Sequence, residues 1–541
     1  MLTMTDPSKQ EEPNQTLPDP PSNFTVEGSL SKELLKLSFT DRTEIEEEIH
    51  GVRCRAAEET PELIKRSLSG FDNKLNEKKE GDPGSNVLKN VVRIEATEGV
   101  NREPTGDQSS KCYLNDPDVR LRFLRCERFV VEKAVQRMID FLEFMSELFG
   151  DYVCERPVRI SDFSREEEAA LQNSRNQYLP FRDRSGRRVL AGVGTCNFHL
   201  DMELRFKILM FLHWSVSEDV ETQQKGVVML CWAFDEANDS TWEKEFRPIM
   251  PKKLHEFHRK QNRALPVRIA SNQQYYRDTA FFRTLSALYV FGLNSYHRSI
   301  YKVNFGEQTE LLYRAASYGI PVDLMPISCT GTLKFANHIA FINVLKFKLD
   351  PKNGEEIVEC PRAYDVVFRK GVTSRHNPGN LHYRELIESF SVEHFKGNKN
   401  EKFEITMRII NKVEERNGRF LEWLNKRQMW FVSTDRDKVR KKIAAAFKQF
   451  NRTRGDSLQI EKTILKTVAS IEDIAPDTET ATAANGRKAS VINEFDFIQA
   501  TKRRKVDMFT PFGTNKHEFI DIDFGGLSCF GKSFFPTEAA S

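Results

Sequence analysis

The feature that most constrains this fold is V-V-M-L-C-W-A-F, an uninterrupted apolar run over residues 227–234. Gly226 precedes the run and Asp235 follows it, so it is a short segment with a clear start and end. Apolar runs of this length that lack alternation are typical of strands buried on both faces. Such strands belong to parallel sheets that helices cover on both sides. The sequence therefore predicts an α/β domain built around this strand.

Segments on either side of the run supply the other elements. The amphipathic helix 131–149 repeats apolar residues at spacings of three and four, so one of its faces must be buried. These residues are Val131, Ala134, Val135, Met138, Phe141, Leu142, Met145 and Leu148. After a turn at Asp183–Gly186, the expected elements are strand 188–193, helix 201–217, strand 267–271, helix 278–291 and strand 300–305.

The order of these landmarks resembles the CRAL-TRIO, or Sec14-like, lipid-binding family. The resemblance covers about residues 115–335. Its motifs are L-R-F-L-R with V-E-K-A, D-R-S-G-R, the central strand, A-F-F-R-T-L-S-A-L-Y, and G-I-P-V-D-L-M-P. It implies a helical lobe, a largely parallel sheet covered by helices, and an apolar lid helix. It also implies non-enzymatic binding, transfer or sensing of a phospholipid or similar lipid in an apolar cavity, with peripheral membrane association.

The resemblance also assigns lipid-lining residues, because acyl chains need aliphatic and aromatic walls. The candidates are Phe211, Met229, Cys231, Ala233, Phe281, Phe282, Leu285, Leu288 and Tyr289, with residues 278–291 as the lid. Without the resemblance, the same helix would be an ordinary buried one. Phosphatidylinositol-transferring relatives use an acidic residue and a lysine where this chain has Arg263 and Tyr301. Lys302 lies one residue on, which places it on the opposite strand face. Phosphoinositide specificity is therefore not implied.

The C-terminal part is similar to a domain of unknown function that follows this lipid-domain type in a divergent algal branch. The shared motifs are D-V-V-F-R-K-G from Asp365, H-N-P-G-N from His376, Y-R from Tyr383, G-R-F-L from Gly418, and Trp430. Arg369 and Lys370 replace the Gly-Arg pair of the pattern, which puts any function of that turn in doubt. Two helices, a two-stranded hairpin and a closing helix predict a small, separate α+β domain.

This last domain is basic. Residues 365–450 contain 19 Lys and Arg against 11 Asp and Glu, a net charge of +8 in a chain of net +2. Candidate anion-binding residues are Lys438, Arg440, Lys441 and Lys442. They could contact nucleic acid or an anionic membrane, or form a solvated face. The alternative function is accordingly a nucleic-acid-binding or regulatory adaptor acting through this domain, with a nucleic acid or protein as its partner.

Motif absences argue against an enzyme. The chain has no G-x-S-x-G, no phosphate-binding P-loop and no H-E-x-x-H. G-V-G-T-C-N at Gly192 lacks the third glycine of a dinucleotide loop, and His255 with His258 lacks a third metal ligand. We therefore expect no cofactor and no metal. Nine scattered cysteines and the lack of a signal-peptide pattern predict a cytoplasmic protein. The basic cluster Lys502–Val506 is compatible with nuclear import.

Together these patterns predict six regions. They are a disordered 1–30, a helical arm and linker at 31–114, a CRAL-TRIO-like domain at 115–347, a linker at 348–364, a basic α+β domain at 365–450, and a mostly disordered tail at 451–541.

Overall fold

The computed structural model describes residues 26–81, 87, 89–93, 113–234, 251–328, 330–348, 356–369 and 377–452. The expected disordered N-terminus up to residue 25, the tail from residue 453, and the cluster Lys502–Val506 lie outside these residues. Two compact units are present. The first contains residues up to Arg384 together with Ile410–Arg436, and the second contains Glu385–Ile409 together with the chain from Asp437.

The first unit is built on a five-stranded sheet in the order β1-β2-β3-β4-β5. The strands are β1 (Asn176–Tyr178), β2 (Arg188–Val193), β3 (Val227–Trp232), β4 (Ile269–Tyr276) and β5 (Tyr301–Phe305). β1 runs antiparallel to β2, and the other neighbours are parallel. The predicted α/β class with a largely parallel sheet is confirmed. The end of β4 was predicted wrongly, because the strand continues past Ser271 to Tyr276.

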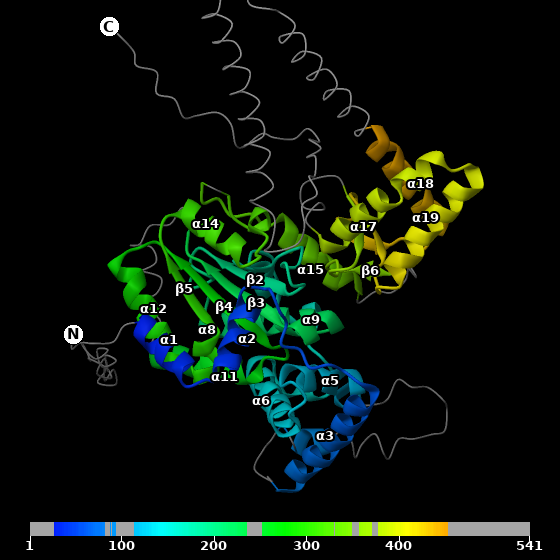
Figure 1. Ribbon diagram of the computed structural model, residues 1–541. Helices are drawn as coiled ribbons and strands as arrows, with labels where there is room; N and C mark the ends of the chain where they lie inside the picture. The colour runs from blue at the N-terminus through cyan, green and yellow to red at the C-terminus, as the bar shows by residue number, and fades with distance from the viewer. Residues whose placement is uncertain are drawn as a thin grey trace, which may run out of the picture. The chain divides into compact units, whose positions relative to one another are not determined.

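Helices cover both faces of this sheet (Figure 1). On one face lie α8 (Met202–Val216) and α12 (Ala280–Gly292), joined along the chain by α9 (Val220–Lys225) and α11 (Pro251–Ala264). On the other lies α14 (Gln308–Ser317), whose Leu311 and Ala315 share a core with Trp232 of β3. Short helices complete the unit: α7 (Arg165–Gln172), α13 (Ser295–Ser299) and single 3₁₀ turns at Tyr113–Asn115, Asp151–Cys154, Ile160–Asp162 and Val322–Leu324.

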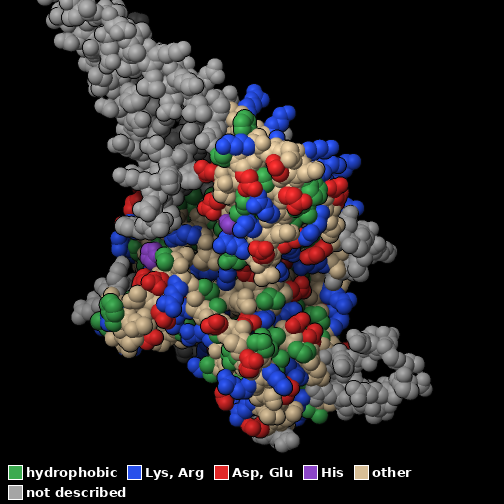
Figure 2. Space-filling model, turned by 45° about the vertical axis from the view of Figure 1, so that its right-hand side comes forward, with side chains coloured by type: hydrophobic (Ala, Val, Ile, Leu, Met, Phe, Trp, Pro, Cys, Tyr) green, Lys and Arg blue, Asp and Glu red, His purple; other side chains and the backbone are tan. Residues whose placement is uncertain are grey.

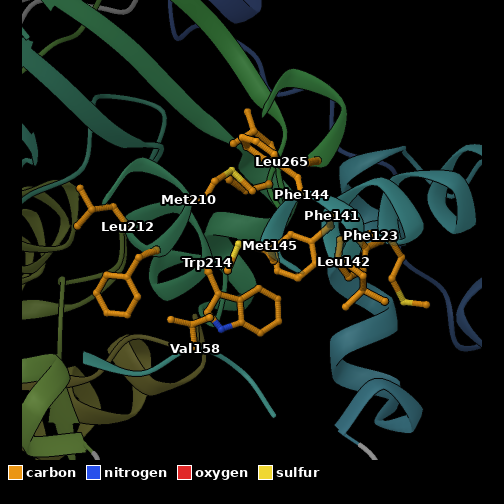
Figure 3. Packing of buried hydrophobic residues seen from close by; sticks show 14 of the residues in the cluster. Phe123, Phe141, Leu142, Phe144, Met145, Val158, Met210, Leu212, Trp214 and Leu265 are labelled. Carbon is orange, nitrogen blue, oxygen red and sulfur yellow. The ribbon is translucent and has the colours of Figure 1, made fainter. Parts of the chain in front are cut away.

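A helical lobe forms from α3 (Pro61–Gly81), α5 (Pro117–Cys126) and α6 (Val131–Phe149). The predicted apolar stripe of α6 is buried except for Val131, which is only partly covered. Figure 3 shows this core, in which Phe141 of α6 stacks on Trp214 of α8 with ring centres 5.0 Å apart. Phe123 of α5 completes the aromatic cluster at 5.5 Å from Phe141. The amphipathic pattern thus fixes the lobe against the sheet domain.

The arm before the lobe contains α1 (Val26–Leu35) and α2 (Phe39–Ile49). In α2 the buried Glu48 carboxylate accepts two hydrogen bonds of 2.8 Å from Arg268, just before β4. This ion pair holds the pKa of the Glu48 carboxyl below its usual value against the opposing effect of burial. The arm is therefore fixed to the sheet domain. No helix among the described residues is long and apolar enough to cross a bilayer.

A second sheet has the order β6-β9-β8-β7 and follows α15 (Ala336–Lys348). Its strands are β6 (Ile357–Val358), β7 (Val366–Phe368), β8 (Phe420–Leu424) and β9 (Met429–Val432). The predicted hairpin is present as β8 and β9. However, β6 lies inside the stretch expected to be a linker. Trp430 of β9 also packs edge-on against Phe181, with ring centres 5.9 Å apart. This sheet therefore shares a core with the first domain. The sequence had suggested that the two would be separate.

The second unit is helical. It contains α18 (Ser391–Lys396), most of α19 (Lys399–Glu414), the end of α17 (Pro378–Ser389) and a helix over residues 436–452. Val439, Ile443 and Phe447 are buried at the expected spacing of four. The Phe447 ring stacks on His394 with centres 3.9 Å apart. The closing helix predicted from these residues is confirmed.

Candidate ligand-binding face

The register of strands β2 to β5 defines the sheet face that α12 covers, which we call the lid-side face. Alternate residues of each strand point to this face. Its first row is Leu190, Met229, Asn272 and Tyr301, its second is Gly192, Cys231, Gln274 and Val303, and its third is Ala233, Tyr276 and Phe305.

Helix α12 closes over one end of this face. Thr279 caps the helix by accepting a hydrogen bond from the Phe282 backbone N–H. The buried Phe282 ring stacks on Tyr276 with centres 5.1 Å apart. Five of the predicted lining residues meet in one cluster here: Cys231, Ala233, Phe281, Phe282 and Leu285. The structure thus brings the central strand and the lid together.

The remaining predicted lining residues behave differently. Tyr289 lies beside Tyr301, with ring centres 5.7 Å apart, and burial raises the pKa of both phenols. Phe211 packs edge-on against Phe163 in the helical core and is not part of the lid cluster, so the structure does not bring it together with the other five. The side chain of Leu288 lies outside the described residues.

Two residues of the middle strand are incompletely covered. Met229 and Cys231 are half-buried, whereas their neighbours Leu230 and Trp232, on the opposite face, are buried. The prediction that residues 227–234 are buried on both faces is therefore wrong at these two positions. Side chains in the middle of a helix-covered sheet are normally shielded from water. The described helices therefore cover these two side chains incompletely.

The lid-side face is polar along β4. Gln274 donates a 2.7 Å hydrogen bond to the Asn272 side chain and accepts one of 2.9 Å from the Tyr276 hydroxyl. A similar ladder on the opposite face joins Ser271, Gln273 and Tyr275. Because both ladders satisfy their polar groups, the S-N-Q-Q-Y-Y segment can form a buried strand. The lid-side face is consequently amphiphilic, whereas the sequence analysis expected it to be uniformly apolar.

The turn after β2 adds a pair of thiols. Cys196 and Asn197 have positive φ angles of 51° and 67°, which turn the chain back toward the sheet. The Cys196 sulfur lies 3.4 Å from the Cys231 sulfur. This contact, together with burial, raises the pKa of the Cys196 thiol, so it stays neutral at ordinary pH. The only sequence sign of this turn is the G-V-G-T-C-N motif.

Arg205 of α8 is a site residue that the sequence analysis missed. It is 4% exposed, and its guanidinium carbon lies 4.4 Å from the centre of the Phe198 ring. Phe198 packs against the same cluster as Cys196, Cys231 and Phe281. Burial lowers the pKa of Arg205 to about 10, with nearby Cys196 and Asp201 opposing the shift. The residue is still charged at neutral pH.

Several motif residues of the C-terminal domain form a hydrogen-bond network around the buried Asp365. Its carboxylate accepts hydrogen bonds from the backbone N–H groups of Arg362 and Arg419 and from the Arg419 guanidinium. Asn380 pairs with both backbone groups of Val367 on β7. A Cβ atom at Gly379 would lie 2.1 Å from the Asp365 carbonyl oxygen. These residues therefore hold the second sheet together, which is sufficient reason for the motif.

The four candidate anion-binding residues lie on the helix 436–452. Lys438 and Lys441 are exposed, Lys442 is half-buried, and Arg440 donates a 3.2 Å hydrogen bond to Asp437. Figure 2 shows Lys and Arg side chains interspersed with Asp and Glu over the visible surface. Among the described residues, no group of three or more His, Cys, Asp or Glu side chains lies close enough to hold a metal ion.

One comparison identifies part of the chain. Residues 365–449 match the family described as "Domain of unknown function (DUF6824)". The similarity of this region to a domain of unknown function is thereby confirmed, and its start agrees with the expected residue 365. No CRAL-TRIO family match is found, and no curated protein matches the chain.

Proposed function

We propose that this protein is a non-enzymatic carrier or sensor that binds one lipid between the lid-side face and α12, as CRAL-TRIO proteins do. The observation that carries the proposal is the half-burial of Met229 and Cys231 on the middle strand, where Cys231 packs with the apolar α12 and Met229 packs with the neighbouring helical core. Space above a central strand, next to Phe281 and Leu285, is suited to a hydrocarbon chain. Each buried methylene group would contribute about 0.8 kcal/mol, so a single acyl chain is enough for tight binding.

The amphiphilic character of the face narrows the ligand class. Asn272 and Gln274 are partnered within their own ladder, so they tolerate an apolar neighbour without losing hydrogen bonds. A molecule with both a chain and a polar group would match the mixture of aromatic, amide and hydroxyl groups on this face. A lipid with a head group fits this pattern better than a pure hydrocarbon does.

Peripheral membrane association is part of the proposal, but α12 alone does not provide the contact surface. Its outward residues Arg283 and Thr284 are polar, and Arg283 pairs with Asp278 at 2.7 Å. The turn between α1 and α2, by contrast, exposes Leu35 and Phe39, which are 69% and 78% accessible. If the exposed Leu35 and Phe39 side chains inserted into a bilayer, the membrane surface would lie next to the lid, because α1 packs against α12.

The adaptor function remains the second candidate. It is supported by the +8 charge of residues 365–450 and by the exposed Lys438 and Lys441. The charges on the visible surface are mixed in sign, and Arg440 is already engaged by Asp437. A mixed surface gives weaker attraction to a polyanion than a continuous basic patch does. We therefore rank lipid binding first.

A single substitution on the lid tests the proposal. Leu285→Asp places a charge against the apolar cluster, whereas Thr284→Asp adds the same charge on the exposed side of the same helix. Native mass spectrometry and lipid extraction of the full chain should find bound lipid in the wild type and in the Thr284 variant. The Leu285 variant should be empty. Equal lipid content in folded samples of all three, or no lipid in the wild type after incubation with a total lipid extract, would refute it.

A further inference from the structure

The most unusual charge in the first unit belongs to Arg205. Its side chain is almost fully buried, with 4% exposed. A buried guanidinium normally has a carboxylate partner. Within the described residues, Arg205 makes no side-chain hydrogen bond and no ion pair, and its guanidinium lies over the Phe198 ring. The only described carboxylate that influences it is Asp201, which is occupied in capping α8 through the Glu203 backbone N–H.

Other buried arginines in the same unit show what is missing. Arg268 is held by both oxygens of Glu48, and Arg187 donates to Asp183 at 2.7 Å. Arg182 likewise pairs with Asp219 at 2.6 Å. In each case a carboxylate offsets the cost of removing the cation from water. Among the described residues, Arg205 has no carboxylate that pairs with it in this way.

The position of Arg205 is where a ligand of an α/β sheet is expected. It lies in the first turns of α8, directly after the turn that ends β2, and the carboxyl ends of parallel strands are the usual binding edge. The helix N-terminus adds partial positive charge at this edge. Arg175 also influences Cys196 electrostatically and donates to the Thr195 hydroxyl in the same turn. Two arginines, Arg175 and Arg205, therefore lie near this edge together with Asp201, and Phe198 of the same turn packs with the cluster of Cys231, Phe281 and Leu285.

We infer that Arg205 is the recognition site for an anionic head group, so that the ligand is an amphiphile whose carboxylate or phosphate pairs with this guanidinium while its chain lies over the lid-side face. A guanidinium can bind either group through two parallel hydrogen bonds. This inference rests on the proposed lipid-binding function and specifies its ligand class.

The test compares ligands that share a chain and differ in charge. Wild-type full-length protein and the variants Arg205→Met and Arg205→Lys are titrated with oleic acid, oleyl alcohol and dioleoyl phosphatidic acid. Arg122→Met is the matched control, because its guanidinium also lies over an aromatic ring, at 4.3 Å from the centre of Trp214, but belongs to the helical lobe.

We expect Arg205→Met to weaken binding of the anionic probe at least tenfold and to leave oleyl alcohol unchanged. Arg205→Lys should keep part of the affinity, and Arg122→Met all of it. A larger loss of affinity for oleic acid would assign the head group as a carboxylate, and a larger loss for phosphatidic acid would assign it as a phosphate. Without ligand, Arg205→Met should melt no lower than wild type, since it removes an uncompensated buried charge. A purely structural arginine would lower the melting temperature instead.

Two results would count against the inference, and they differ from failure of the proposed function. Equal binding of oleic acid and oleyl alcohol by wild type, with no change in Arg205→Met, would leave a lipid site that ignores charge. An equal loss of both probes in Arg205→Met would assign Arg205 to the fold. If no lipid probe binds wild type, the proposed function fails. In that case thermal stabilisation by inorganic phosphate, absent in Arg205→Met, would still support the anion site by itself.

Discussion

The two faces of the central strands differ although they are built from neighbouring residues. On the face toward α14, Leu230, Trp232 and Tyr275 are buried in one continuous core. On the lid-side face, Met229 and Cys231 are half-buried, Cys231 against α12 and Met229 against the helical core. The β4 ladders on the two sides are alike in chemistry, since each joins a small polar residue, a glutamine and a tyrosine. The difference is therefore in how completely the helices cover each face.

This contrast separates stability from function within one sheet. Complete coverage contributes the apolar burial that holds the domain together, and it leaves no space for another molecule. Incomplete coverage sacrifices part of that burial on the face whose cluster includes Phe198, the ring under Arg205, and Arg205 has no carboxylate partner among the described residues. Sites that bind ligands commonly retain such local costs, because the ligand offsets them. We expect the two faces to respond differently to the same kind of substitution.

The largest expected difference is between Trp232→Ala and Met229→Ala. Trp232 is fully buried, so its truncation should cost about 3–5 kcal/mol in the free energy of unfolding. Met229 is half-buried, so Met229→Ala should lower the free energy of unfolding by only about 1 kcal/mol, because part of its surface is already exposed. Urea unfolding of ligand-free protein measures both, provided that the slopes agree. Similar losses for the two variants would mean that the lid-side face is packed as tightly as the other.

The sequence identified most of the elements that set up this contrast. The period-3.6 stripe of α6 and the apolar run of β3 are local patterns, and both predicted the observed element. The sequence analysis failed where polar side chains find their partners only in the folded structure. S-N-Q-Q-Y-Y has the composition of a loop, yet its alternate residues pair on each face of β4. Arg205 is one of three charged residues near the start of α8, with Glu203 and Lys207, and only the surrounding elements show that Lys207 has described carboxylate partners and Arg205 has none.

The two ladders offer a finer test of the same contrast. Gln273→Leu would leave the Ser271 and Tyr275 hydroxyls buried without partners on the closed face, at a cost of about 1–3 kcal/mol. Gln274→Leu removes the equivalent hydrogen bonds on the lid-side face, where Gln274 is 7% exposed and pairs in register with the half-buried Cys231, so we expect a water molecule to replace them. Its cost should be at most roughly half as large. If thermal and urea unfolding give equal losses, water does not reach the lid-side ladder.

The smallest expected effect concerns what holds the lid in place. Glu33 of α1 accepts hydrogen bonds from Ser295 at 2.7 Å and from Arg298 at 3.2 Å on α13, and Leu30 of α1 packs with Val290 of α12. The Ser295 hydrogen bond, followed by Lys36, lowers the pKa of the Glu33 carboxyl below its ordinary value of 4.5. A lowered pKa stabilises the attachment above the unfolded value, and this contribution is lost as the pH falls through the folded value.

Glu33→Gln should therefore release bound lipid somewhat faster at neutral pH, by about threefold, since it removes one partly buried ion pair and leaves a side-chain oxygen to accept from Ser295. Release from wild type should accelerate only as the pH falls below about 4.5, and the variant should lose that acceleration. Stopped-flow transfer of a fluorescent fatty acid to acceptor vesicles measures both rates. Glu47→Gln on α2 is the control, because it removes a carboxylate from the same arm and leaves the Glu33 contacts intact. Equal release rates for wild type and both variants would mean that α1 does not restrain the lid, and that the packing of Phe282 and Leu285 alone closes this face.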